Sequence, residues 1–155
     1  MMASTASSPA VARFPRAVLF DLDGTLLDSA PDMLATVNRM RASLGIAPMT
    51  LPALRPFVSK GGRAMTGAAF PALSKDEVVA RVPEFLKIYH EELGRHSAPF
   101  DDVDTLLAAL EAEGIVWGIV TNKPEYLARD ILPQLGWQQR CAVLIGGDSL
   151  PERKP

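Results

Sequence analysis

Two aspartates stand two residues apart, Asp21 and Asp23, where the short apolar run 17–20 ends. Such a run is typical of a strand buried on both faces of a parallel sheet, and ligands bind at the carboxyl ends of these strands. Gly24 lets the backbone turn sharply and approach a ligand closely, and Thr25 adds a hydroxyl. Acids and a glycine after a strand can also form a simple turn, but the whole pattern favours a binding site.

Phosphoryl transfer is a reaction in which two such acids have separate uses. One ionised carboxylate can attack phosphorus and form an aspartyl-phosphate. A second acid can protonate the leaving oxygen and then deprotonate the hydrolytic water. Because a phosphate dianion here meets a carboxylate, a divalent cation is needed to offset the repulsion, and hard oxygen ligands suit Mg²⁺. The pair therefore predicts phosphoryl transfer with Mg²⁺ as the cofactor.

A second candidate stretch, Thr121 and Asn122, follows the apolar run 115–120 and precedes a helix that begins at Pro124. A hydroxyl, free backbone N–H groups and the positive end of a helix form a phosphate cradle when they converge. The alternative is an ordinary helix N-cap at one of these two residues. The presence of the aspartate pair earlier in the chain favours the cradle.

Two cationic positions complete the set of candidates. Lys154 follows the third apolar run, and a lysine there can neutralise the charge of a phosphate and its nucleophile; an isolated lysine would otherwise be a solvated charge. Arg63 ends the glycine-containing stretch 59–63. It can contact the non-reacting anionic part of a substrate, or it can belong to a flexible turn between helices.

The elements that must position these residues alternate between strands and helices. The apolar runs 17–20, 115–120 and 141–145 predict three strands. A helix is expected from a cap at Asp28 or Ser29 to Gly45, and further helices are expected over 102–113 and 124–135. This order favours right-handed crossovers and an α/β fold with a Rossmann-like parallel sheet of three core strands.

The middle of the chain predicts helices without convincing strands. Ser74 and Glu77 form a capping box before an apolar stripe, and we expect Pro83 to break or offset the helix that follows. The helical block 31–99 is interpreted as an inserted cap domain rather than one long crossover, because such long connections are uncommon unless functional. The remaining ranges are a disordered leader over 1–15 and a phosphatase core over 16–30 and 100–155.

These motifs resemble those of the haloacid-dehalogenase superfamily, from Asp21-Leu-Asp-Gly-Thr through Val120-Thr-Asn-Lys-Pro to Arg153-Lys-Pro. Within it the chain is similar to the phosphoglycolate phosphatase group and to the phosphatases of N-acetylmuramic acid 6-phosphate. The resemblance implies that Asp21 is the nucleophile, Asp23 the general acid and base, Thr121 the phosphoryl ligand and Lys154 the charge-balancing lysine. It also implies that the Asp21 carboxylate and the Asp23 carbonyl bind Mg²⁺.

The chain departs from the superfamily pattern after Lys154, because the acids of a fourth motif and their strand do not follow. We therefore expect a C-terminally shortened chain that binds Mg²⁺ weakly, turns over slowly or not at all, and has low stability. The absent strand would pair with the Asp21 strand, so an open sheet edge is also expected.

Composition sets the functional class more broadly. A net charge of −2 gives no footprint for nucleic acid, and no apolar run reaches the length of a membrane span. A single cysteine favours a reducing, cytoplasmic compartment. The predicted partner is a small phosphorylated metabolite, with no prediction of oligomeric state. Two alternatives to a phosphatase are a sugar-phosphate mutase of the same superfamily and a non-catalytic fragment that binds a partner through its strand edge.

Overall fold

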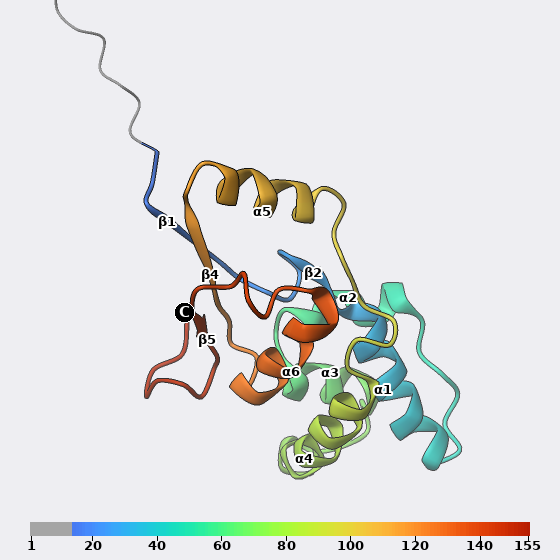
Figure 1. Cartoon of the computed structure of the whole chain (residues 1–155). Coiled ribbons are helices and arrows are strands. Elements are labelled where there is room, and N and C mark those ends of the chain that lie inside the picture. Colours follow the sequence, from blue (N-terminus) through green and yellow to red (C-terminus); the bar gives the residue numbers. More distant parts are fainter. Residues whose placement is uncertain (1–13) are drawn as a thin grey trace, which may run out of the picture.

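A computed structural model describes residues 14–155, so the predicted leader lies outside the described residues apart from Phe14 and Pro15. Three parallel strands form its main sheet: β1 (Ala17–Phe20), β4 (Val116–Val120) and β5 (Leu144–Ile145), in the order β1-β4-β5 (Figure 1). The α/β fold with a Rossmann-like parallel sheet of three core strands is confirmed. The third strand is shorter than the predicted 141–145.

Two helices alternate with these strands. Helix α5 (Val103–Ala112) leads into β4, and α6 (Glu125–Leu135) connects β4 to β5. Both agree with the predicted ranges to within a residue at each end. Gly136 ends α6 in the left-handed conformation, with φ of 71°, which glycine adopts at little cost. The hydrophobic periodicity and the glycine that follows each helix together predicted these two ranges.

Four helices lie between β2 (Leu27–Asp28) and β3 (Ala98–Pro99) in the chain. They are α1 (Ala30–Ser43), α2 (Leu51–Val58), α3 (Gly62–Ala69) and α4 (Lys75–Glu92), and they are called the helical insert from here on. Figure 1 shows them as a group beside the sheet. The inserted helical layer is confirmed, whereas the domain boundaries at 30/31 and 99/100 stay a prediction.

A short antiparallel pair stands where the chain enters and leaves the helical insert. Strand β2 (Leu27–Asp28) pairs with β3 (Ala98–Pro99). The expectation of a middle region without strands is therefore wrong at Ala98–Pro99. A two-residue strand has too few positions for a hydrophobic period, so no sequence pattern predicts it.

Helix α4 confirms one expectation and corrects another. Ser74 Oγ accepts the N–H of Glu77 at 3.3 Å, and the Glu77 carboxylate accepts the N–H of Ser74 at 2.7 Å, which completes the capping box. Pro83 does not break the helix, which continues to Glu92. The buried residues Phe85 and Tyr89 lie beyond the proline, and their packing offsets the lost backbone hydrogen bond.

Within the described residues, helices cover only one face of the main sheet. Trp117 and Ile119 of β4 are buried, and the Trp117 ring meets the Trp137 ring edge to face at 5.9 Å. On the opposite face Leu19 is 59% exposed and Val116 is 54% exposed. The prediction that β1 is buried on both faces is wrong, because helices pack on a single side of this sheet.

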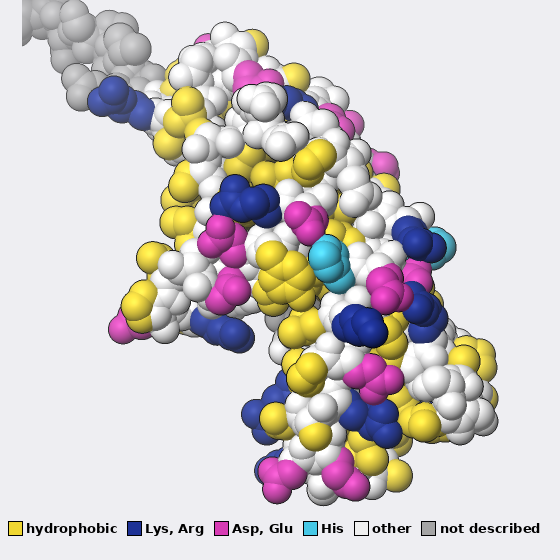
Figure 2. All heavy atoms as spheres, turned by 60° about the horizontal axis from the view of Figure 1, so that its bottom comes forward, with side chains coloured by type: hydrophobic (Ala, Val, Ile, Leu, Met, Phe, Trp, Pro, Cys, Tyr) yellow, Lys and Arg dark blue, Asp and Glu magenta, His cyan; other side chains and the backbone are white. Residues whose placement is uncertain are grey.

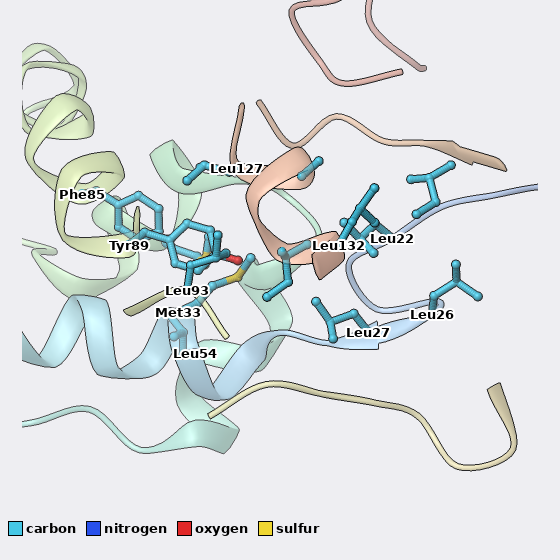
Figure 3. Packing of buried hydrophobic residues seen from close by; sticks show 14 of the residues in the cluster. Leu22, Leu26, Leu27, Met33, Leu54, Phe85, Tyr89, Leu93, Leu127 and Leu132 are labelled. Atoms are coloured by element: carbon cyan, nitrogen blue, oxygen red, sulfur yellow. The ribbon is translucent and has the colours of Figure 1, made fainter. Parts of the chain in front are cut away.

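One apolar cluster joins the helical insert to the rest of the molecule. Figure 3 shows Phe85 and Tyr89 side by side on α4, with Leu127 and Leu132 contributed by α6. The two aromatic rings are 5.9 Å apart between centroids. This shared core holds the insert over the carboxyl ends of β1 and β4.

Candidate active site

A cavity of about 390 Å³ lies between the carboxyl ends of β1 and β4 and the helical insert. Figure 2 shows an indentation between these two parts, with Lys or Arg side chains on both sides of it. Six of the eight predicted site residues line the cavity. They are Asp21, Asp23, Arg63, Thr121, Asn122 and Lys154.

Asp21 lies directly after β1 and forms an ion pair with Lys154. The distance from Lys154 Nζ to Asp21 Oδ1 is 3.0 Å, and the two side chains are 33% and 40% exposed respectively. The N–H of Leu22 donates to the same Asp21 oxygen at 2.8 Å. Both contacts hold one carboxylate oxygen, and the group is still open to the cavity, as an attacking group requires.

Lys154 is brought to Asp21 by the loop after β4. Its backbone N–H donates to Asn122 Oδ1 at 3.0 Å, and Asn122 Nδ2 donates to the Lys154 carbonyl at 3.4 Å. The Asn122 amide thus fixes the segment that carries the lysine. Asn122 and Lys154 are far apart in the sequence, and they meet here because they follow the neighbouring parallel strands β4 and β5.

Asp23 has a different environment from Asp21. Its side chain is 15% exposed, and the buried Lys123 Nζ lies 3.1 Å from Oδ1 and 3.4 Å from Oδ2. Lys123 Nζ also donates to the hydroxyl oxygen of Tyr89 on α4. The two carboxylates therefore line one cavity, each with its own lysine.

The loop after β4 is not a helix cap. Thr121 is 3% exposed, and its Oγ1 accepts the N–H of Lys123 at 3.1 Å. Helix α6 begins only at Glu125, whose N–H donates to Asp148 Oδ1 at 2.7 Å. The N-cap interpretation of Thr121 and Asn122 is wrong, because Asp148 from the loop after β5 accepts the N–H of the first helical residue.

Glycines after β5 let that loop pack against the site. A Cβ on Gly147 would lie 2.2 Å from the Asn122 carbonyl oxygen, and a Cβ on Gly146 would lie 2.4 Å from Glu125 Cα. Gly147 also donates its N–H to the Lys123 carbonyl at 2.8 Å. Only residues without a side chain fit at these two positions.

The remaining predicted residues fall into two groups. Gly24 and Thr25 form a tight turn outside the lining of the cavity, with Gly24 at φ of 78°, so their part in substrate binding stays a prediction. Arg63 lies in the first turn of α3 and lines the cavity from the side of the insert. Its contact with the non-reacting part of a substrate stays a prediction.

Comparison with known proteins decides which family has this arrangement. The family model described as haloacid dehalogenase-like hydrolase matches residues 18–155. The chain belongs to this family. It is 67% identical over 143 residues to the phosphoglycolate phosphatase of Xanthomonas campestris pv. campestris, covering 92% of this chain and 65% of that relative.

Two further matches agree with the family. The N-acetylmuramic acid 6-phosphate phosphatase of Pseudomonas aeruginosa is 45% identical, over 90% of this chain and 62% of that protein. The crystal structure of a predicted phosphoglycolate phosphatase from Haemophilus somnus superposes with a TM-score of 0.78 at 29% identity, covering 90% of this chain and 66% of that one. The chain thus spans about 65% of the length of the first of these curated relatives.

The described residues offer few side-chain ligands for a metal ion. Within residues 14–155 no group of three or more His, Cys, Asp and Glu side chains is arranged to hold a metal ion. Mg²⁺ nevertheless binds many sites through one or two carboxylates, substrate phosphate and retained waters. The Asp21 carboxylate fits that pattern, because Asp21 lines the cavity, whereas a role for the Asp23 carbonyl stays a prediction.

Sequence reasoning missed two residues of this family member's cavity. Lys123 stands inside the second motif, and a charged residue three positions after the end of a buried strand is the signal that marks it. Tyr89 has no such signal, because its spacing on α4 matches an ordinary apolar stripe. No helix in the described part of the chain is long and apolar enough to cross a membrane.

Proposed function

We propose that this protein is a phosphoric monoester hydrolase that acts through an aspartyl-phosphate on Asp21. The observation that carries the proposal is the meeting of Asp21, Asp23, Thr121 and Lys154 around one cavity. Four residues from three separate stretches, each with a chemical use in phosphoryl transfer, converge at the carboxyl edge of a parallel sheet.

The first half-reaction transfers the phosphoryl group to the protein. An Asp21 oxygen forms a bond to phosphorus while the ester P–O bond breaks, and the leaving oxygen takes a proton from Asp23. Lys154 offsets the negative charge around Asp21 at a distance of 3.0 Å. The Thr121 hydroxyl and Asn122 hold phosphoryl oxygens in the proposed cradle.

The second half-reaction releases phosphate. Asp23, now ionised, takes a proton from water, whose oxygen forms a bond to phosphorus as the bond to Asp21 breaks. A bound Mg²⁺, held by the Asp21 carboxylate and the Asp23 carbonyl, would supply charge neutralisation between phosphate and carboxylate. The dependence on Mg²⁺ is part of the proposal.

The proposed substrate is a small phosphorylated metabolite that carries a second polar or anionic group. The cavity volume of about 390 Å³ suits a small ligand, and Arg63 lines the side opposite the carboxylates. The names of the two curated relatives point to 2-phosphoglycolate and N-acetylmuramic acid 6-phosphate as the compounds to test. The single cysteine supports a cytoplasmic setting.

The test is phosphate release from both compounds with and without Mg²⁺, at high protein concentration. We expect release that requires Mg²⁺ and is abolished by Asp21→Asn, with Asp101→Asn, an exposed acid outside the cavity, as the matched control. Equal release by both variants would contradict the assignment of Asp21. A requirement for a sugar bisphosphate, with return of the phosphoryl group to sugar, would favour the mutase instead. No release under any condition would favour the non-catalytic alternative.

A further inference from the structure

Lys123 is a buried cation that the proposed reaction does not use. Its side chain is 2% exposed, yet it lines the cavity. Burial of an ammonium group is costly unless it is paired and hydrogen-bonded. Its Nζ contacts both Asp23 oxygens, at 3.1 and 3.4 Å, so a single cation restrains the rotation of that carboxylate.

The second partner of Lys123 comes from the helical insert. Tyr89 on α4 is 2% exposed, and its hydroxyl oxygen accepts a hydrogen bond from Lys123 Nζ. The ammonium also lies 4.3 Å from the centroid of the Tyr89 ring, within the range of a cation–π contact. Figure 3 places Tyr89 in the cluster that the insert shares with Leu127 of α6.

The backbone of Lys123 belongs to the same assembly. Its N–H donates to Thr121 Oγ1 at 3.1 Å, and its carbonyl accepts the N–H of Gly147 at 2.8 Å. One residue therefore contacts the proposed acid, the proposed phosphoryl ligand and the insert. These contacts leave Lys123 little freedom to move independently of its neighbours.

We propose that Lys123 is a positioning residue, which orients the Asp23 carboxylate and makes that orientation depend on the seating of α4 through Tyr89. The inference rests on the proposed function, because it assigns the leaving-group step to Asp23. A lysine that only neutralises buried charge would stabilise the protein without affecting one step of the reaction more than another.

Leaving-group dependence separates these two roles. The glycolate oxygen of 2-phosphoglycolate needs a proton as it leaves, whereas the stable phenolate of 4-nitrophenyl phosphate needs little help from an acid. We expect Lys123→Met to lower kcat for both esters, with the loss for 2-phosphoglycolate on the order of ten-fold larger than the loss for the aryl ester. The change in KM should be smaller. Equal losses for the two esters would overturn the positioning role.

Three further variants sharpen this measurement. Tyr89→Phe keeps the ring and removes the hydroxyl, so it should shift the ratio of the two kcat values in the same direction by a smaller factor. In an Asp23→Asn background Lys123→Met should leave the ratio unchanged. Lys87→Met is the matched control, because Lys87 is an exposed lysine of α4 outside the lining of the cavity; its ratio should equal that of the wild type.

A double-mutant cycle of Tm values requires no catalytic activity, so it tests the contacts of Lys123 separately from the proposed function. Asp23→Asn leaves a buried lysine without its counter-ion, so it should lower Tm, and adding Lys123→Met should restore part of the loss. Tyr89→Phe should lower Tm in the wild type but not in the Lys123→Met variant. If the wild type with Mg²⁺ releases phosphate from none of the esters tested, the proposed function has failed, and this cycle then tests the contacts of Lys123 alone. Additive Tm losses would overturn the inference.

Discussion

Asp32 is a fully buried carboxylate whose partners explain its burial. Its side chain accepts the backbone N–H groups of Gly94 and His96, at 2.7 and 2.6 Å, and the hydroxyl of Ser97. The residue is fully buried in the first turn of α1, where a negative charge interacts favourably with the helix dipole. Asp32 thereby joins the chain entering the helical insert to the chain leaving it.

Removal of this carboxylate should destabilise the protein strongly. Asp32→Ala leaves three donors unpaired in the interior, and we expect a loss of roughly 3 kcal/mol in the free energy of unfolding. Asp32→Asn keeps one acceptor oxygen and should lose less. Urea denaturation followed by circular dichroism measures both losses, and an Asp32→Ala protein as stable as the wild type would contradict the role given to these hydrogen bonds.

Glu111 gives the stability of the sheet a dependence on pH. Its Oε1 accepts the indole N–H of Trp117 at 2.8 Å and Arg140 Nε at 2.9 Å. These hydrogen bonds, that of Trp117 first, hold the pKa of the Glu111 carboxyl below its ordinary value of 4.5. Since the folded pKa is the lower one, this contribution to stability is complete above about pH 4.5 and is lost as the pH falls through the folded pKa.

The measurement is Tm against pH from 7 down to 3, read by tryptophan fluorescence. Glu111→Gln cannot ionise, so its Tm should fall less steeply on the acid side than that of the wild type. Glu113→Gln, an exposed neighbour, is the control and should follow the wild-type curve. Identical acid limbs for wild type and Glu111→Gln would show that this carboxyl is not responsible.

Elements with long periodic patterns could be predicted from the sequence, whereas those set by tertiary contacts could not. Helices α5 and α6 follow from their apolar stripes and glycine stops. The exposed face of β1 and the pairing of β2 with β3 depend on what packs beside them, and a four-residue or two-residue run contains no record of its neighbours. Pro83 shows the same override, since packing of Phe85 and Tyr89 outweighs a local helix-breaking preference.

The loop after β5 offers a direct test at the scale of elements. In Gly147→Ala the new Cβ would lie 2.2 Å from the Asn122 carbonyl oxygen, so the loop after β4 must shift. We expect a loss of about 2 kcal/mol from this overpacking, together with a weaker Asn122–Lys154 interaction. Gly67→Ala is the matched control, because Gly67 lies inside α3 and a Cβ there would be 3.9 Å from its nearest neighbour, Val78 of α4. Alanine there should stabilise the helix by about 0.5–1 kcal/mol. Chemical denaturation of both variants decides the point; a loss for Gly67→Ala and none for Gly147→Ala would contradict it.

At the scale of the molecule, the candidate site exists only where the sheet and the helical insert meet. The order of motifs along the chain predicted that Asp21, Thr121 and Lys154 converge, because parallel strands place their carboxyl ends on one edge. The contact of Lys123 with Tyr89 could not be predicted, since it depends on how α4 packs against the loop after β4. Sequence patterns thus predict the chemistry of the residues that follow the strands of the sheet. The fold determines which residues of the helical insert cover them.

The uncovered face of the main sheet governs how the whole molecule behaves in solution. Leu19, Val116 and Val143 are 59%, 54% and 42% exposed. Leu19 and Val143 both approach the same face of Gly118, since a Cβ there would lie 3.1 and 2.5 Å from their side chains. Leu19 also belongs to β1, one of the two edge strands of the described sheet. An apolar face next to an unpaired strand edge favours association with other chains.

We therefore expect the sedimentation coefficient of the wild type to rise with protein concentration, because association buries this face. Leu19→Lys places a charge at its centre and should flatten that dependence. Val79→Lys is the matched control, because Val79 is 48% exposed on α4, away from the sheet, and its curve should follow the wild type. Sedimentation velocity over a wide range of concentration measures all three proteins. A wild type that stays monomeric throughout, or equal flattening by both lysines, would show that the face of β1 and β4 does not drive association.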